Sequence, residues 1–104
     1  MSMTLDELRD WHAKRAGWTQ KIEGDFEDAK WCLHHHSQWD HPYPETLDGA
    51  DASFPKGWDW RRYGLRLWHA FSTKFETVFV HATGDKTRDL YELSKLAWEQ
   101  EAAR

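Results

Sequence analysis

Cysteine is nearly absent from this sequence of 104 residues, in which Cys32 stands alone. One cysteine excludes an internal disulfide framework and is typical of a reducing compartment. No run of about 18 apolar residues occurs, so the sequence predicts no membrane-spanning helix. A basic segment followed by an apolar one is also missing at the start, and we therefore expect no secretory signal and a cytoplasmic location.

A strong excess of one charge sign is missing too. The chain has 14 Lys and Arg against 18 Asp and Glu, a formal net charge of −4. This balance disfavours broad binding to the phosphate backbone of nucleic acids, and the acidic excess is too small for a mimic of DNA. The motifs of phosphate-binding loops, dinucleotide-binding folds, serine hydrolases and zinc proteases are absent, so the sequence favours a non-enzymatic protein without a cofactor.

Aliphatic residues are scarce, and aromatic residues take their place. Leu, Phe, Val and Ile together number 17, whereas the chain has eight Trp and three Tyr. A large aromatic side chain buries about 150–250 Å² on folding, so these residues can supply the apolar area of one domain. Because Trp is seldom fully buried, we expect at least one of four to be exposed and to mark a binding face: Trp39, Trp58, Trp60 or Trp68.

Helical periodicity occurs in three segments, which span residues 5–16, 45–53 and 86–102. The first follows a capping box formed by Thr4 and Glu7. Thr46 and the Thr83-Gly84-Asp85 turn supply N-caps for the other two.

Alternation of apolar and polar side chains predicts a three-stranded antiparallel meander within residues 58–82, with a hairpin loop at 72–74. The strand runs are 58–61, 65–71 and 75–81. A further strand is expected at 30–36, and residues 18–29 are expected to form a loop or a short extended piece. The order of elements predicts one α+β domain over residues 1–104, in which N- and C-terminal helices pack on a small antiparallel sheet of three to four strands.

Aromatic and basic residues are interleaved most densely between positions 58 and 68. Guanidinium groups beside ring faces stack on bases, hold phosphates and are common at protein interfaces. Arg61 and Arg62 point to opposite faces of a strand, so at least one of them should be exposed. Core tryptophans with arginines at their margin are an alternative interpretation. The candidate binding residues are Trp58, Trp60, Arg61, Arg62, Tyr63, Arg66 and Trp68.

One cysteine and three histidines form a candidate metal cluster: Cys32, His34, His36 and His41. On a strand, the first three would project to one side, and thiolate and neutral imidazole are good zinc ligands. The spacing matches no known zinc finger, and a second cysteine is missing. We therefore expect a polar strand face and no metal, with a metal site as the alternative.

Turn motifs in the second half of the sequence resemble those of a known family. They are HPYPETLDGA at 41–50, FPKGW at 54–58, TGD at 83–85 and DLYEL at 89–93. They are similar to small accessory proteins of bacteriophages and prophages whose C-terminal half is the phage ABA-sandwich domain. The resemblance implies a helix, a small antiparallel sheet and a closing helix, in a protein made during infection that inhibits or modulates host or defence proteins.

Three functional hypotheses follow from these patterns and from the resemblance. The first is a non-enzymatic protein that binds a host or defence protein stoichiometrically. The second is a protein that sequesters a nucleotide-type signalling ligand through Arg and Trp side chains. The third is a small metal-dependent hydrolase built on Cys32 and the neighbouring histidines. None of them requires a membrane, and nucleic acid is not an expected partner.

Overall fold

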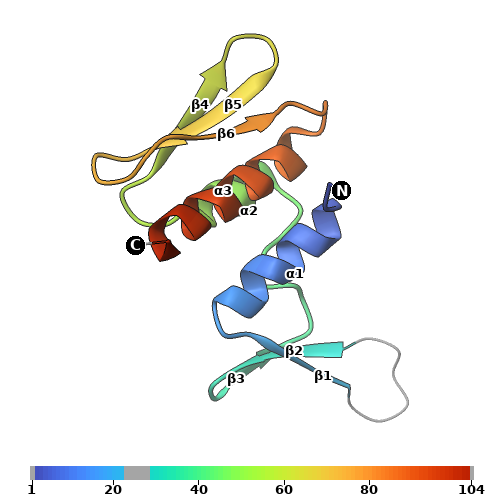
Figure 1. The fold of residues 1–104 in the computed structure, drawn as a ribbon. Helices are drawn as coiled ribbons and strands as arrows, with labels where there is room; N and C mark the ends of the chain where they lie inside the picture. Colours follow the sequence, from blue (N-terminus) through green and yellow to red (C-terminus); the bar gives the residue numbers. More distant parts are fainter. Residues whose placement is uncertain (1, 23–28, 104) are drawn as a thin grey trace.

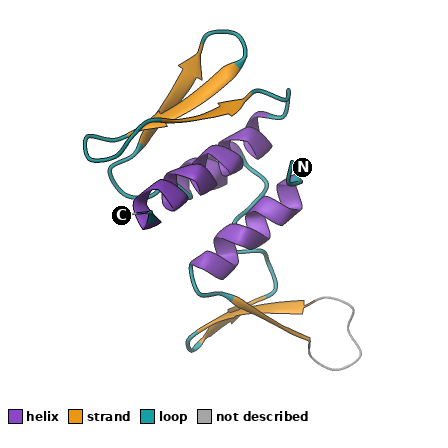
Figure 2. Cartoon of the chain, in the orientation of Figure 1, coloured by secondary structure: helices purple, strands orange, loops and turns teal. Residues whose placement is uncertain are grey.

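The computed structural model of the chain describes residues 2–22 and 29–103. These residues form three helices and two antiparallel sheets of three strands each. The two sheets lie at opposite ends of the molecule, with α1 and α3 side by side between them (Figure 1; Figure 2). The predicted α+β class, with N- and C-terminal helices beside small antiparallel sheets, is confirmed.

The helices begin at the N-caps that the sequence predicts. They are α1 (Leu5–Arg15), α2 (Leu47–Ala52) and α3 (Lys86–Ala102). In each case the side chain of the preceding residue accepts a hydrogen bond from the backbone N–H of the third helical residue. The capping box at α1 is complete, because the Glu7 carboxylate also accepts from the Thr4 N–H at 3.0 Å.

The second sheet is the predicted meander, with the order β4 (Asp59–Tyr63), β5 (Leu67–Phe71) and β6 (Val78–His81). The expectation that its third strand begins at residue 75 is wrong. The Ser72 hydroxyl accepts hydrogen bonds from the N–H groups of Lys74 and Phe75, which holds the chain in a turn. The Phe75 ring then stacks on Trp58 at 6.0 Å, outside the strand ladder.

The expectation that β5 begins at residue 65 is wrong as well. Residues 64–66 form the turn between β4 and β5, where Gly64 has a φ of 67°. Leu65 lies at the tip of this turn with 90% of its surface exposed. A positive φ is accessible to glycine because it lacks a Cβ atom, and the turn therefore forms there.

The first sheet has the order β1 (Thr19–Ile22), β2 (Ala29–Leu33) and β3 (His36–Gln38). The predicted single strand at 30–36 is wrong, because the chain reverses at His34, whose φ is 54°, and His35. Of the loop or extended piece expected at 18–29, residues 19–22 are extended as β1. The part at 23–28 lies outside the described residues.

The hydrophobic core lies between α3 and the inner face of β4–β6. The register places Trp60 opposite Ala70 and Arg62 opposite Trp68, so these side chains share the inner face. Val78 and Val80 of β6 extend this face, as the partners of Ala70 and Trp68. Fully buried residues of α1 and α3 complete the core: Leu8, Leu90, Tyr91 and Leu93.

Candidate functional site

The seven predicted binding residues lie on both faces of the β4–β6 sheet and do not form one surface. Trp60, Arg62 and Trp68 belong to the inner face, whereas Arg61 and Tyr63 belong to the outer face. Trp58 precedes β4, and Arg66 lies in the turn before β5. The alternation of side chains along a strand produces this division, and it confirms that Arg61 and Arg62 point to opposite faces.

Two of the three tryptophans of the candidate set are hydrogen-bonded to helix residues, and the third lies in the core. Trp68 is buried and meets the Trp60 ring edge-on, with ring centroids 5.9 Å apart. The indole N–H of Trp60 donates to Asp51 at 2.6 Å, and that of Trp58 donates to Glu101 at 2.6 Å. These contacts agree with the alternative interpretation of this stretch, in which the tryptophans support the core. The exposed tryptophan that the sequence predicts is Trp39, half of whose surface is accessible.

Arg62 and Arg66 contribute differently to the turn between β4 and β5. The Arg62 guanidinium donates to the carbonyl oxygens of Gly64, at 3.2 Å, and of Leu65. Its carbon also lies 4.7 Å from the centroid of the Trp68 ring. Arg62 therefore holds the turn in place, whereas the Arg66 side chain is exposed to solvent.

The outer face of the sheet carries a cluster of rings beside one arginine, which we name the aromatic face and define as Arg61, Tyr63, His69, Phe71 and Phe79. His69 lies at its centre on β5, with its ring centroid 5.2 Å from that of Tyr63, 5.1 Å from Phe71 and 5.9 Å from Phe79. The Arg61 guanidinium lies 5.2 Å from the Phe71 ring centroid. Tyr63 is 56% exposed and Phe79 is 46% exposed.

No helix among residues 2–22 and 29–103 covers the aromatic face, because α3 packs on the opposite side of the sheet (Figure 1; Figure 2). Arg61 and Tyr63 are among the binding residues predicted from the sequence, whereas His69, Phe71 and Phe79 are not. Their strand alternation was visible in the sequence. However, aromatic residues occur at both odd-numbered and even-numbered positions of these strands, and so on both faces of the sheet. Periodicity alone therefore did not separate the core face from the exposed face.

Charge is distributed unevenly between this sheet and the rest of the chain. Residues 56–82 contain five Lys or Arg and two Asp or Glu, an excess of three positive charges. Since the whole chain has a net charge of −4, the remaining residues carry an excess of seven negative charges. The aromatic face therefore belongs to the basic part of an acidic protein.

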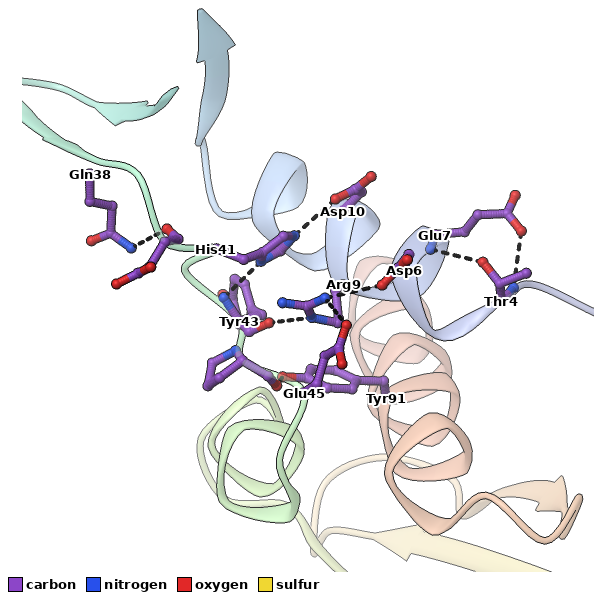
Figure 3. Close-up of polar contacts among 12 residues, drawn as sticks. Thr4, Asp6, Glu7, Arg9, Asp10, Gln38, His41, Tyr43, Glu45 and Tyr91 are labelled. Carbon is purple, nitrogen blue, oxygen red and sulfur yellow. Dashed lines mark hydrogen bonds and ion pairs between the residues drawn. The ribbon is translucent and has the colours of Figure 1, made fainter. Parts of the chain in front are cut away.

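A second cluster of polar side chains lies between α1 and the loop that carries His41, Tyr43 and Glu45 (Figure 3). Arg9 links α1 to the loop between β3 and α2, since its guanidinium donates to the Tyr43 carbonyl at 2.6 Å and to the Glu45 carboxylate at 2.8 Å. His41 and Asp10 are joined by a 2.9 Å hydrogen bond. An open cavity of about 620 Å³ lies beside this cluster, and its lining includes Arg9, Asp10, His41, Glu45, Trp31 and the exposed Trp39.

The His41–Asp10 pair resembles a catalytic dyad in composition, but both imidazole nitrogens are occupied. The Tyr43 N–H donates to His41 Nδ1 at 3.0 Å, so the other nitrogen, Nε2, carries the proton that is donated to Asp10. Burial lowers the pKa of His41 from its ordinary value, and the hydrogen bond to Asp10 opposes this only in part. With no free lone pair, the neutral ring cannot accept a substrate proton. We interpret the pair as a structural link between α1 and the loop.

The candidate metal ligands are separated by the reversal at His34. Cys32 lies opposite Ser37 in the β2–β3 hairpin, whereas His34 stands in the turn, so these two side chains do not share a strand face. His36 contacts Gln38 at 3.0 Å, and His41 is bound to Asp10. The expected projection of Cys32, His34 and His36 to one side is therefore wrong.

Within the described ranges, no group of three or more Cys, His, Asp and Glu side chains is placed to hold a metal ion. That the protein needs no metal stays a prediction, which elemental analysis of untagged protein would test. The helices of residues 2–22 and 29–103 include none that is both long and apolar enough to span a membrane. Comparison with protein-family models, curated proteins and solved structures finds no match for this chain.

Proposed function

We propose that this chain is a stoichiometric binding protein, not an enzyme, and that its aromatic face binds an acidic surface of a partner protein. One observation carries the proposal: Tyr63 and Phe79 expose their rings beside Arg61, on a sheet face that α3 leaves open. Contiguous exposed apolar surface of this kind is typical of interaction sites in soluble proteins.

The composition of the aromatic face suits a protein interface. Tyr and Arg are enriched among the residues that dominate binding energy, together with other large aromatic side chains. The rings of the face already contact one another, and the Phe71 ring lies beside the Arg61 guanidinium. Side chains held in this way lose less conformational entropy on binding than free ones.

Charge complementarity favours an acidic partner. The excess of three positive charges within residues 56–82 attracts an anionic surface, whereas the excess of seven negative charges elsewhere repels it. A partner with acidic side chains is therefore steered toward the end of the molecule that carries the β4–β6 sheet. The resemblance to phage accessory proteins makes a host or defence protein, inhibited or modulated in the host cytoplasm, the partner that we propose.

The two alternative functions have less support. A nucleotide would need a free guanidinium beside an accessible ring face, and Arg62, whose guanidinium lies over the Trp68 ring, is bound to the turn at Gly64 and Leu65. The exposed rings of Tyr63 and Phe79 meet at 74°, edge to face, and do not form parallel platforms for bases. A metal-dependent hydrolase on Cys32 and the histidines lacks a converging ligand set among the described residues.

A binding experiment with matched variants tests the proposal. A partner captured from lysate of the bacterial host is identified, purified and titrated calorimetrically against the parent protein and against a Tyr63→Ser, Phe79→Ser double variant. The matched control is Trp39→Ser, which removes a ring of similar exposure that directly follows β3, in the other sheet.

We expect a 1:1 complex, a loss of at least about 30-fold in affinity for the double variant, since hot-spot residues contribute about 2 kcal/mol or more, and little change for the control. Equal affinity of the double variant and the parent, with unchanged melting temperatures, would refute the assignment of the aromatic face.

A further inference from the structure

The outer edge of β4 is open. In the described part of the chain, β4 has β5 as its only strand neighbour. The opposite edge of the same sheet, β6, lies near the N-terminus, where Ser2 lines a small cavity with Phe79, Val80 and His81. A strand edge with unpaired backbone groups is a template for a strand from another chain.

One hydrogen bond and the strand register define which backbone groups of β4 point outward. The Ala82 N–H donates to the Arg66 carbonyl at 2.7 Å, so the even-numbered residues along β5 bond toward β6 and the odd-numbered ones toward β4. Arg61 is the partner of His69, and it therefore bonds to β5. By the alternation of the ladder, the N–H and C=O groups of Trp60 and Arg62 point away from the sheet.

The Trp60 amide agrees with this assignment. Its N–H donates to the Asp59 carboxylate at 3.1 Å. Asp59 is also the one acidic residue of β4, which contains Arg61 and Arg62. Among the charged side chains of β4, the two arginines therefore outnumber the one carboxylate, with Arg61 on one face of the strand and Arg62 on the other.

We propose that an extended acidic segment of the partner protein adds to the sheet as a fourth strand beside β4. This inference rests on the proposed function, because it specifies how the partner would reach the aromatic face. Backbone groups of the segment would pair with Trp60 and Arg62, the mode known as β-augmentation. Acidic side chains of the segment would lie next to Arg61, and apolar ones next to the exposed Tyr63 ring.

Asp59 has a specific place in this proposal. Its carboxylate covers the Trp60 N–H and adds a negative charge at the edge. An incoming acidic strand must displace that carboxylate, so Asp59 disfavours unselective pairing of other strands with the β4 edge. Its removal should tighten binding.

The test uses a defined peptide of alternating Glu and Val, eight residues long and blocked at both termini. Its affinity is measured by fluorescence anisotropy and by NMR titration into the millimolar range. A second peptide of the same sequence has N-methyl groups on the residues that would donate to β4. A ten-nucleotide oligothymidine is the anionic control of another class.

Arg62→Pro and Arg62→Ala form the matched pair of variants. Both remove the side chain, but only proline removes the outward N–H, at a position whose N–H does not bond to β5. We expect Arg62→Pro to bind the peptide about tenfold more weakly than Arg62→Ala, and the parent protein to bind the methylated peptide about tenfold more weakly than the unmethylated one, in each case for one lost hydrogen bond. Asp59→Ala should bind more tightly, and the Trp60 and Arg62 amides should become protected from hydrogen exchange.

The outcomes separate this inference from the proposed function. In one outcome, the methylated peptide binds as tightly as the unmethylated one, while the Tyr63→Ser, Phe79→Ser double variant binds both peptides more weakly than the parent protein does. That result refutes the strand addition and leaves the aromatic face as the binding surface. Absence of peptide binding by the parent protein refutes the strand addition too. Tighter binding of the oligothymidine than of the peptide refutes both proposals. If Arg62→Pro fails to fold by circular dichroism, the methylated peptide still decides.

Discussion

The two sheets of this protein have the same number of strands, the same antiparallel pairing and the same strand order, yet their surroundings differ. In β4–β6, one face packs on α3 and places Trp68, Ala70 and Val80 in the core. In β1–β3, all four residues of β1 are exposed, and Trp31 is the buried aromatic residue. Backbone hydrogen bonding is alike in the two sheets, whereas burial of apolar surface is not.

This difference shows what a small sheet needs in order to be stable. A three-stranded sheet gains little from its ladder alone, because the same backbone groups bond to water in the unfolded chain. Packing of one face against a helix supplies the missing free energy. Once that face is covered, the opposite face of β4–β6 is free to carry exposed rings, and this is where we place the binding surface.

The largest expected effect comes from the two buried tryptophans, one in each sheet. We expect Trp68→Ala to lower the free energy of unfolding by about 3–5 kcal/mol, because it leaves a cavity in the core. Trp31→Ala should leave β4–β6 and α3 folded and should increase hydrogen exchange mainly in β1–β3. Urea denaturation and amide exchange by NMR measure both. A global loss of stability in Trp31→Ala equal to that in Trp68→Ala would break the comparison between the sheets.

A second effect concerns His12, which joins α1 to α3 between the two sheets. Its Nε2 donates to the Tyr91 carbonyl at 2.9 Å, and burial, reinforced by the charges of Arg15 and Lys95, lowers the pKa of His12 to about 4. Between about pH 6.5 and pH 4, the unfolded chain binds a proton at this residue and the folded chain does not. Stability contributed by neutral His12 is therefore complete above pH 6.5 and lost as the pH falls toward 4.

The expected size of this loss is about 3–4 kcal/mol, because the pKa of His12 is lowered from 6.5 to about 4 and each unit of pKa corresponds to about 1.4 kcal/mol. Urea denaturation at a series of pH values should give a steeper acid dependence for the parent than for His12→Phe, which cannot titrate. His35→Gln, at an exposed position, is the control and should behave as the parent does. Parallel profiles for the parent and His12→Phe would contradict the prediction.

The adjacent arginines sharpen the distinction between the outer and inner faces of β4. Arg61→Ala should weaken binding to the partner about 30-fold and leave stability unchanged, since an interface arginine contributes about 2 kcal/mol. Arg62→Ala should do the reverse, with a loss of about 1 kcal/mol of stability from the contacts to the turn. Calorimetric titration and thermal denaturation of both variants give the two readouts. Equal effects on binding would mean that the faces are not functionally distinct.

The smallest effect is expected at the start of α1, the helix that precedes the first sheet. Thr4→Ala removes the hydroxyl that accepts from the Glu7 N–H at 3.2 Å. The loss of this cap should lower stability by about 1 kcal/mol. Thr46→Ala, at the cap of α2, is the matched variant in a helix that packs on α3. Chemical denaturation compares them, and no change in either variant would show that the caps are dispensable.

Much of the fold follows from local chemistry that the sequence displays. Thr4, Thr46 and Asp85 mark helix starts because their side-chain oxygens satisfy N–H groups that a helix leaves unpaired. The boundaries of α3 agree with the prediction for the same reason. Strand ends were harder to predict, since the turn at Ser72 depends on two hydrogen bonds to one hydroxyl and the reversal at His34 depends on one backbone angle.

For the candidate site, the sequence and the tertiary structure contributed different information. The sequence by itself determined that rings and guanidinium groups gather between positions 58 and 68, that Arg61 and Arg62 separate across a strand, and that the chain is acidic while this stretch is basic. Only the tertiary structure decided which face α3 covers, and it brought His69, Phe71 and Phe79 to Tyr63. Alternation sorts side chains into two sets, but the choice of the buried set depends on packing against a helix that begins about 20 residues farther along the chain.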